Sequence, residues 1–337
     1  MGSKIALKNA QDQEFSINHN DNAGAISINS NDISKKSEIE TTIAPYNKGF
    51  KNYIINGGFD VWQRGTSFTG LTNATYSSDR WVVYDSVGDI NYNVIRNAGV
   101  FTGGYGASYT FNSGTGIRSV IQFIENVTRF KVGSKVTISF EAYTNSTPYT
   151  VAVAIQGTKG VWASATGEVA SNIALTNTKT KYSVTLTIPD WTSLGINWVR
   201  LEDTKLALKF NLGTNTNGRD FILGSVQLEE GSVATPFENR PIGLELSLCQ
   251  RYFSKGLVTA RGSAAGPNVL ISVPFYYPVS MRVVPTVTLT DGGSRYNLSS
   301  AIVGGAGDLY SSRFEIVSGG PGDFYAIHDI WTASAEL

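Results

Sequence analysis

The sequence predicts an all-β protein built from β-sandwiches, and three observations support this prediction. Short runs in which apolar and polar residues alternate recur along the chain, most clearly at 136–142 and 182–188, and a period of two is typical of strands with one buried face. Turn-forming clusters such as 103–104 and 215–218 separate these runs, and glycine supplies 35 of the 337 residues. No long helical pattern interrupts the series, so many short strands joined by tight turns are expected.

The first segment, residues 1–45, predicts a small β meander. Its short alternating runs are joined by stretches rich in Asn, Asp and Gly, which favour turns because they tolerate left-handed backbone angles. A short helix over 32–40 is expected before Pro45 ends it. The segment is too small and polar to bury a core alone, so it needs a partner or sister chains.

The second segment, residues 46–240, predicts the main β-sandwich, because one face of its alternating runs is apolar and the other carries Thr, Ser or Lys. Residues 241–254 form a short helical joint, with Pro241 at the first helical turn. Residues 255–337 predict a second and smaller β-sandwich, in which Pro285 marks an edge strand or a bulge.

Composition excludes several classes of function. Lys and Arg together number 27, and so do Asp and Glu, so no basic excess exists to neutralise nucleic-acid phosphates or anionic lipid. A single cysteine, Cys249, excludes an intrachain disulfide framework and a zinc site of several thiolates. The N-terminal residues lack an apolar signal core, and no apolar span is long enough for membrane insertion. A soluble chain synthesised in the cytoplasm is expected.

Residues for enzymatic chemistry are scarce, and the sequence predicts a protein that is not an enzyme. The two histidines, His19 and His328, fall in different predicted domains. Cys249 lies among leucines on the predicted helix, where a buried and inert thiol is expected. Carboxylate pairs such as Glu229-Glu230 are adjacent, and neighbours along a strand point to opposite faces. No cofactor is expected.

Binding is the better interpretation, because aromatic side chains lie outside the clearest core alternation. Flat aromatic faces can stack on pyranose C–H groups, although each such residue can instead pack in a core. In the main sandwich the glycan-stacking candidates are Tyr143, Tyr149, Trp162, Trp191 and Trp198. In the C-terminal segment the candidate receptor contacts are Tyr296, Tyr310, Phe324, Tyr325, His328 and Trp331. Trp62 and Trp81 are expected to pack in the core.

Two long motifs bracket the main sandwich. The first reads NYIINGGFDVWQRGTS at 52–67 and continues with SDRW at 78–81; the second reads VQLEEGSVATPFENRP at 226–241 and continues with ELSLCQRY at 245–252. They closely resemble the opening and the end of a module common in bacteriophage tail fibres and related virion proteins. The resemblance implies that 46–240 is a jelly-roll β-sandwich similar to carbohydrate-binding modules.

Shorter phrases and a calcium site extend this resemblance. IALKNA at 5–10 resembles the virion-proximal segment of a fibre, and MRVVPTV at 281–287 resembles a phrase found at fibre tips. In related sugar-binding jelly rolls a calcium ion often staples the opening and closing strands, and here Asp60 or Glu229 could supply oxygen ligands. The sequence lacks a dense acidic loop for calcium.

Together these features predict a phage tail-fibre subunit that forms a homotrimer in the virion. Residues 1–45 would bind other tail or baseplate proteins, the jelly roll would form the body, and 255–337 would form a tip that engages a glycan or protein on the host surface. Several tethered copies would turn weak single-site binding into firm attachment. The alternative is a purely structural virion protein, such as a baseplate, neck or capsid-decorating fibre, with no receptor-binding activity.

Overall fold

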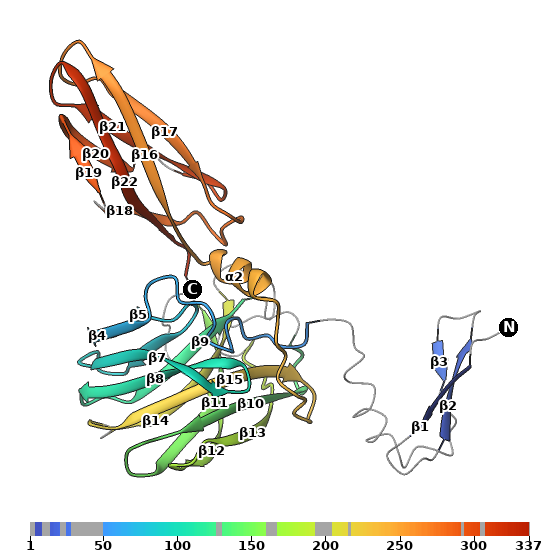
Figure 1. Ribbon diagram of the computed structural model, residues 1–337. Helices are drawn as coiled ribbons and strands as arrows, with labels where there is room; N and C mark the ends of the chain where they lie inside the picture. Colours follow the sequence, from blue (N-terminus) through green and yellow to red (C-terminus); the bar gives the residue numbers. More distant parts are fainter. Residues whose placement is uncertain are drawn as a thin grey trace. The chain divides into compact units, whose positions relative to one another are not determined.

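A computed structural model describes residues 4–8, 14–20, 25–27, 50–125, 130–159, 167–192, 204–214, 217–290, 293–303 and 307–336. Nearly all of its regular structure is β-strand, with one short helix among the described residues (Figure 1). The predicted fold class is therefore confirmed. The chain divides into two compact units, 1–50 and 51–337.

The N-terminal unit contains the expected meander. Three antiparallel strands pair in the order β1-β2-β3. Their bounds are β1 Lys4–Lys8, β2 Glu14–Asn20 and β3 Ala25–Ser27. The short helix expected over 32–40 lies outside the described residues.

The main sandwich consists of two six-stranded antiparallel sheets. One sheet has the order β13-β10-β15-β8-β7-β4 and the other β12-β11-β14-β9-β6-β5. The strands of the first are β4 Ser67–Leu71, β7 Asn91–Phe101, β8 Gly104–Ser113, β10 Lys135–Tyr143, β13 Thr180–Thr187 and β15 Asp220–Glu230. Those of the second are β5 Thr75–Tyr76, β6 Val82–Asp85, β9 Arg118–Ile124, β11 Tyr149–Lys159, β12 Val169–Leu175 and β14 Thr204–Gly213. Successive strands pass repeatedly between the sheets, as β8, β9, β10 and β11 do, which is the winding of a jelly roll.

The core of the jelly roll lies between its two sheets. Phe140 on β10 meets Phe210 on β14 edge to face, with ring centroids 4.9 Å apart. Trp81 is fully buried, stacks on Phe59 at 5.1 Å and donates its indole N–H to the carbonyl of Asn56. Trp62 is also buried, so the expectation that both tryptophans of the opening motif pack in the core is confirmed.

A helix connects the jelly roll to the last part of the chain. Helix α2 spans Ile242–Gln250, and Pro241 occupies its N-cap position, where a missing N–H is harmless. The helix buries Cys249, and this burial raises the pKa of the thiol well above its usual value, which keeps the sulfur protonated and unreactive. Its Glu245 carboxylate accepts hydrogen bonds from the backbone N–H of Asn56 and from Arg240.

The C-terminal part of the chain is a second and smaller β-sandwich. One sheet has the order β16-β22-β18, with β19 also paired to β22, and the other has the order β17-β21-β20. Their bounds are β16 Phe253–Ala264, β17 Leu270–Tyr276, β18 Thr286–Thr290, β19 Ser294–Tyr296, β20 Leu298–Val303, β21 Ser311–Ser318 and β22 Gly322–Ser334. Pro285 directly precedes β18, which among the described strands pairs with β22 alone, in agreement with the first of the two expectations, an edge strand or a bulge. Phe275, Phe314 and Ile316 pack between the sheets.

Candidate functional site

The aromatic residues of the C-terminal sandwich divide into a buried set and an exposed set. Phe324 has no exposed surface, and Trp331 is buried in the same core with its ring stacked on Phe275 at 4.8 Å. The prediction that these two residues contact a receptor is therefore wrong. Both lie on β22 and point inward, although they are seven residues apart, because the pairing of β22 with β16 shifts register between Val258 and Ala260.

Tyr296 and Tyr325 lie on the outer face and form a pair. Tyr325 follows Phe324 on β22 and so points to the opposite face of the sheet. Tyr296 on β19 is directly opposite Tyr325 in the strand register. The two rings stack with centroids 5.6 Å apart at an interplanar angle of 25°, and 57% of Tyr296 is exposed.

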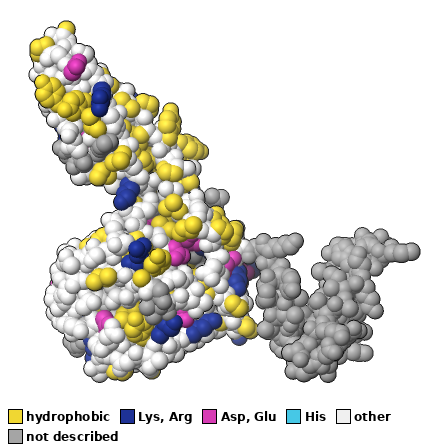
Figure 2. Space-filling model, viewed as in Figure 1, with side chains coloured by type: hydrophobic (Ala, Val, Ile, Leu, Met, Phe, Trp, Pro, Cys, Tyr) yellow, Lys and Arg dark blue, Asp and Glu magenta, His cyan; other side chains and the backbone are white. Residues whose placement is uncertain are grey.

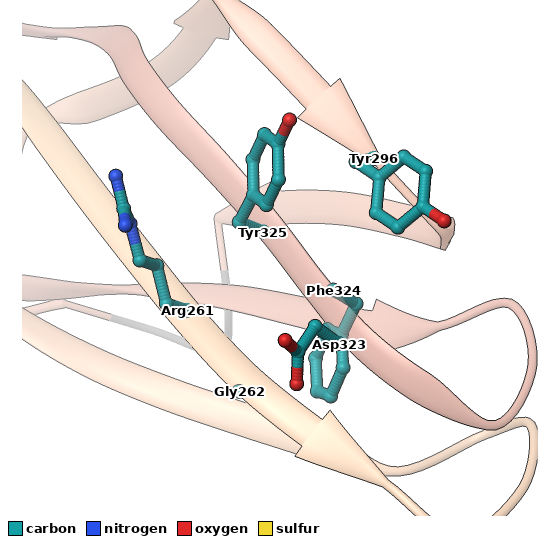
Figure 3. A pocket seen from close by; sticks show the side chains of 6 residues that line it. All are labelled: Arg261, Gly262, Tyr296, Asp323, Phe324 and Tyr325. Carbon is teal, nitrogen blue, oxygen red and sulfur yellow. The ribbon is translucent and has the colours of Figure 1, made fainter.

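Arg261 extends this pair into a row across three strands. It lies on β16, opposite Tyr325 on the other side of β22, so all three side chains share one face. Its guanidinium carbon lies 5.8 Å from the centre of the Tyr325 ring, within cation–π range. Figure 3 shows the three side chains next to one another on neighbouring strands.

This row borders an open groove of about 740 Å³, whose lining also includes Gly262, Asp323 and Phe324. Asp323 lies two residues before Tyr325 and therefore on the same face of β22. Among the described residues, neither Asp323 nor Arg261 takes part in an ion pair. The groove thus offers an aromatic wall, a hydrogen-bond acceptor and a guanidinium donor that are available to a ligand.

Gly262 allows the core to close directly beneath the groove. A Cβ at this position would lie 2.0 Å from Ile271 Cδ1 and 2.9 Å from the Phe324 ring. The missing side chain lets these two groups pack against the β16 backbone, which supports the outer face on a rigid sheet. Phe324 therefore supports the groove from below.

The other predicted tip residues do not join this groove. Tyr310 is 61% exposed but lies in the turn before β21, where its backbone N–H donates to Asp308 at 2.7 Å. The side chain of His328 lies outside the described set.

The sequence analysis did not identify Arg261 and Asp323 as candidates. An arginine in an alternating strand with small neighbours was the available signal for Arg261, whereas nothing distinguished Asp323 from an ordinary surface carboxylate.

In the C-terminal sandwich, exposed apolar side chains are dispersed. They include Leu257, Tyr276 and Val284, each more than half exposed. On the face seen in Figure 2, apolar side chains are spread along the C-terminal sandwich and charged side chains are sparse. The groove is therefore defined by its geometry and by its two charged groups more than by a local excess of apolar surface.

The glycan-stacking candidates of the jelly roll lie in less accessible settings. Trp191 is 1% exposed and donates its indole N–H to Gly167 at 2.5 Å, so the prediction of a sugar platform there is wrong. The sequence pattern missed this because Trp191 follows the end of β13 and lies outside any alternating run. Tyr149 is half-buried, and its hydroxyl donates to the carbonyl of Asp220 at 2.9 Å.

Tyr143 is also half-buried, with its ring centroid 6.2 Å from that of Phe101. Trp162 and Trp198 lie outside the described residues. The described aromatic candidates of the jelly roll, Tyr143, Tyr149 and Trp191, therefore do not form a cluster.

The two carboxylates expected to bind calcium do not share partners. Glu229 is buried and accepts three hydrogen bonds, from the Gln227 side chain, the Thr235 N–H and the Thr235 hydroxyl, at 2.7–2.9 Å. Its oxygens are therefore engaged by protein donors and do not fit a calcium ligand. Burial, together with the nearby charge of Glu245, raises the pKa of Asp60 to about 6. Among the described residues, no group of three or more His, Cys, Asp or Glu side chains is placed to hold a metal ion.

Comparison with known proteins gives structural similarities at low sequence identity. No protein-family model matches the sequence, and no curated protein matches it. A solved CBM4 structure shares 19% identity over 52% of this chain and 98% of its own, with a TM-score of 0.34. The CBM22-1 xylan-binding domain of Xyn10C from Paenibacillus barcinonensis shares 11% identity over 50% of this chain and 98% of its own, with a TM-score of 0.33.

A bacteriophage structure is also among these neighbours. The enzymatically active domain of tailspike protein 4 from bacteriophage CBA120 shares 15% identity over 53% of this chain, with a TM-score of 0.35. The match covers 21% of the tailspike chain.

In the part of our chain that the structure describes, none of the helical structure is long and apolar enough to cross a membrane.

Proposed function

We propose that this protein is a phage tail-fibre subunit that attaches the virion to a glycan on the host surface through the groove of its C-terminal sandwich. The observation that carries the binding part is the row of Arg261, Tyr325 and Tyr296 with Asp323 beside it. The fibre part rests on the two motifs at 52–81 and 226–252, which resemble those of fibre proteins.

The groove suits a saccharide because it offers an aromatic surface for the C–H groups of a sugar and polar groups for its hydroxyls. A pyranose presents C–H groups that pack on aromatic rings, and Tyr296, which is 57% exposed and backed by the stacked ring of Tyr325, offers such a ring on a rigid sheet. Sugar hydroxyls both donate and accept hydrogen bonds. Asp323 can accept from two neighbouring hydroxyls, and Arg261 can donate to hydroxyl or ring oxygens.

Charge in the groove favours a neutral saccharide. One carboxylate and one guanidinium line the groove, so their charges offset one another and neither a strongly acidic nor a strongly basic ligand gains a large net attraction. A single shallow groove of this kind binds weakly. Firm attachment follows when several linked copies engage one surface.

The proposal assigns binding and no reaction to the protein. Recognition without catalysis requires only a shaped groove with suitable donors and acceptors. Residues 1–45 would serve as the part that binds other tail or baseplate proteins, and a homotrimer would supply the several copies.

The test is glycan binding by the full-length protein. A neutral oligosaccharide that the wild type retains on a glycan array is titrated against Tyr325→Ala, with Tyr310→Ala as the matched control, because Tyr310 is exposed but lies outside the groove. Loss of an aromatic hot spot costs about 2 kcal/mol, or roughly thirtyfold in affinity. If no glycan is retained, the structural virion protein becomes the better interpretation. If both variants bind as the wild type does, the glycan binds outside this groove.

A further inference from the structure

Two motifs at the start of the jelly roll each place an arginine side chain at the joint with the C-terminal sandwich. Arg64 belongs to the motif at 52–67 and Arg80 to the SDRW motif at 78–81. The structure pairs both arginines with Glu336, near the end of the chain.

Arg80 is almost completely buried, with 1% of its side chain exposed. One of its terminal nitrogens pairs with a carboxylate oxygen of Glu336, and the other donates to the carbonyl of Phe123 at 2.6 Å. Its guanidinium carbon lies 3.5 Å from the centre of the Tyr252 ring. A guanidinium in such a site needs its counter-charge, because an unpaired buried charge is strongly destabilising.

Arg64 approaches Glu336 from the other side. Its Nη2 donates to the second carboxylate oxygen at 3.1 Å, and its guanidinium carbon lies 3.7 Å from the centre of the Phe253 ring. Asp79 holds the two motifs together, since its carboxylate accepts the backbone N–H of Gln63 at 2.6 Å and lies 3.7 Å from Arg64. The four residues Arg64, Arg80, Tyr252 and Phe253 thus form a carboxylate socket.

The backbone next to Glu336 is held at the same place. The N–H of Ala335 donates to the carbonyl of Tyr252 at 2.7 Å, and Arg282 donates to the carbonyl of Ala335 at 3.0 Å. On the other side of the joint, the Gln63 amide donates to the carbonyl of Phe253 at 2.7 Å. The entry to β16 is therefore bonded to the jelly roll through Gln63, and the exit from β22 is bonded to the joint through Tyr252.

We propose that the carboxylate socket is a latch: it binds the carboxylate that the chain's own C-terminal segment supplies and holds the two sandwiches in one fixed orientation. A single covalent connection through α2 would leave the C-terminal sandwich free to pivot. The latch adds a second attachment after the last strand, so the two sandwiches move and unfold together.

Strand β22 connects the latch to the groove. It has 13 residues, or about 40 Å at roughly 3.3 Å per residue. Asp323 and Tyr325 lie near its start, and Glu336 follows its end. Fixing the end of this strand therefore also fixes the direction in which the groove faces.

The test uses the full-length protein with Glu336→Gln, which keeps the shape of the side chain and removes its charge. The wild type should unfold in one thermal transition. The variant should show an earlier, separate transition of the C-terminal sandwich, lowered by roughly 5–10 °C, because Arg80 stays buried without its counter-charge. Trypsin cleavage after Arg251, in the joint, should accelerate on the order of tenfold as the joint opens.

A matched control and a second variant keep this test decisive. Glu315→Gln removes the 2.9 Å pair with Arg313, whose side chain is 55% exposed, and should change neither measurement. Glu336→Asp keeps the charge and should recover much of the lost stability, even if Glu336→Gln does not fold. If Glu336→Gln behaves like Glu315→Gln, or if Asp and Gln at 336 are equally damaging, the latch is refuted. If the Glu336 variants behave as expected but the wild-type protein binds no glycan, the latch stands and only the proposed function is contradicted.

Discussion

The side chain of Asn52 binds the backbone of Leu228, 176 residues later in the chain: the N–H of Leu228 donates to Asn52 Oδ1 at 3.1 Å. The same side chain donates to the carbonyl of Val226 at 3.1 Å. The backbone N–H of Asn52 in turn donates to Glu238 at 2.9 Å. The two motifs that bracket the jelly roll therefore bond to each other directly, through Asn52 at the start of the first motif.

We expect Asn52→Ala to destabilise the jelly roll. Asn52 is buried, so its loss leaves the backbone groups of Val226 and Leu228 without their partner, and each such group costs about 1–3 kcal/mol. Chemical denaturation of the full-length protein measures the loss. Asn112→Ala is the control, because Asn112 is exposed and its side chain donates to the side chains of Asn91 and Asn93, so its loss should cost less than about 0.5 kcal/mol. Equal stability of the two variants would contradict the role assigned to Asn52.

The pH dependence of stability should change in Asp60→Asn. Burial raises the pKa of Asp60 to about 6 in the folded protein, above its usual value of 3.8. The folded state therefore binds this proton more tightly than the unfolded state, and stability falls as the pH rises from about 4 to 6. Asparagine stays neutral, so the variant should melt above the wild type at pH 8 and together with it at pH 4.

Asp89→Asn provides a control of opposite sign for that experiment. Hydrogen bonds from the Thr115 N–H and hydroxyl lower the pKa of the Asp89 carboxyl. Such a group stabilises the fold above its unfolded pKa, and this contribution is lost as the pH falls through the folded value. The Asp89 variant should therefore melt below the wild type at pH 8. If the difference in melting temperature between Asp60→Asn and the wild type stays constant from pH 4 to 8, ionisation of Asp60 does not contribute to the pH dependence of stability.

Much of the fold could be predicted because strand alternation is a local signal. In β10, Val136, Ile138 and Phe140 face the core as their spacing indicates. The same signal fails where two aromatic residues are adjacent. Phe324 and Tyr325 both suit a buried position, and only the pairing of β22 with its neighbours decides which of them points inward.

Partners that are distant in sequence could not be predicted at all. Arg80 binds Glu336, 256 residues further along the chain, and no local pattern in the sequence indicates this partner. The groove illustrates the same limit, because Arg261, Tyr296 and Tyr325 come from three strands whose order is set by sheet topology. Sequence patterns identified the two tyrosines as candidates and could not show that they stack.

A homotrimer is the expected assembly of the full-length protein. The meander of β1–β3 is a separate small unit, and a segment of this size gains a core most readily by joining sister chains. Light scattering should give about three times the chain mass of 36.3 kDa. A chain beginning at Lys48 should remain folded and lose this assembly. A strict monomer at micromolar concentration would rule out a trimer that forms without the virion.

Host recognition should depend on the C-terminal sandwich and not on the jelly roll. In the jelly roll, Trp191 is buried and the Tyr149 hydroxyl is engaged by Asp220. In the C-terminal sandwich, Tyr296 and Tyr325 share an accessible face beside a groove. Because exposed groups on a rigid sheet can contact a receptor without any cost in core packing, these two tyrosines are the better contacts.

Virions that carry Tyr296→Ala with Tyr325→Ala should therefore adsorb to host cells more slowly than the wild type, while the isolated protein keeps its circular dichroism and melting temperature. Trp331→Ala should act differently, since removing a core tryptophan costs about 3–5 kcal/mol and lowers the melting temperature first. Multivalency masks part of a single-site loss, so the isolated protein must be tested beside the virion. If the folded double variant adsorbs as the wild type does in both assays, recognition lies elsewhere, and Trp162 becomes the next residue of the jelly roll to test.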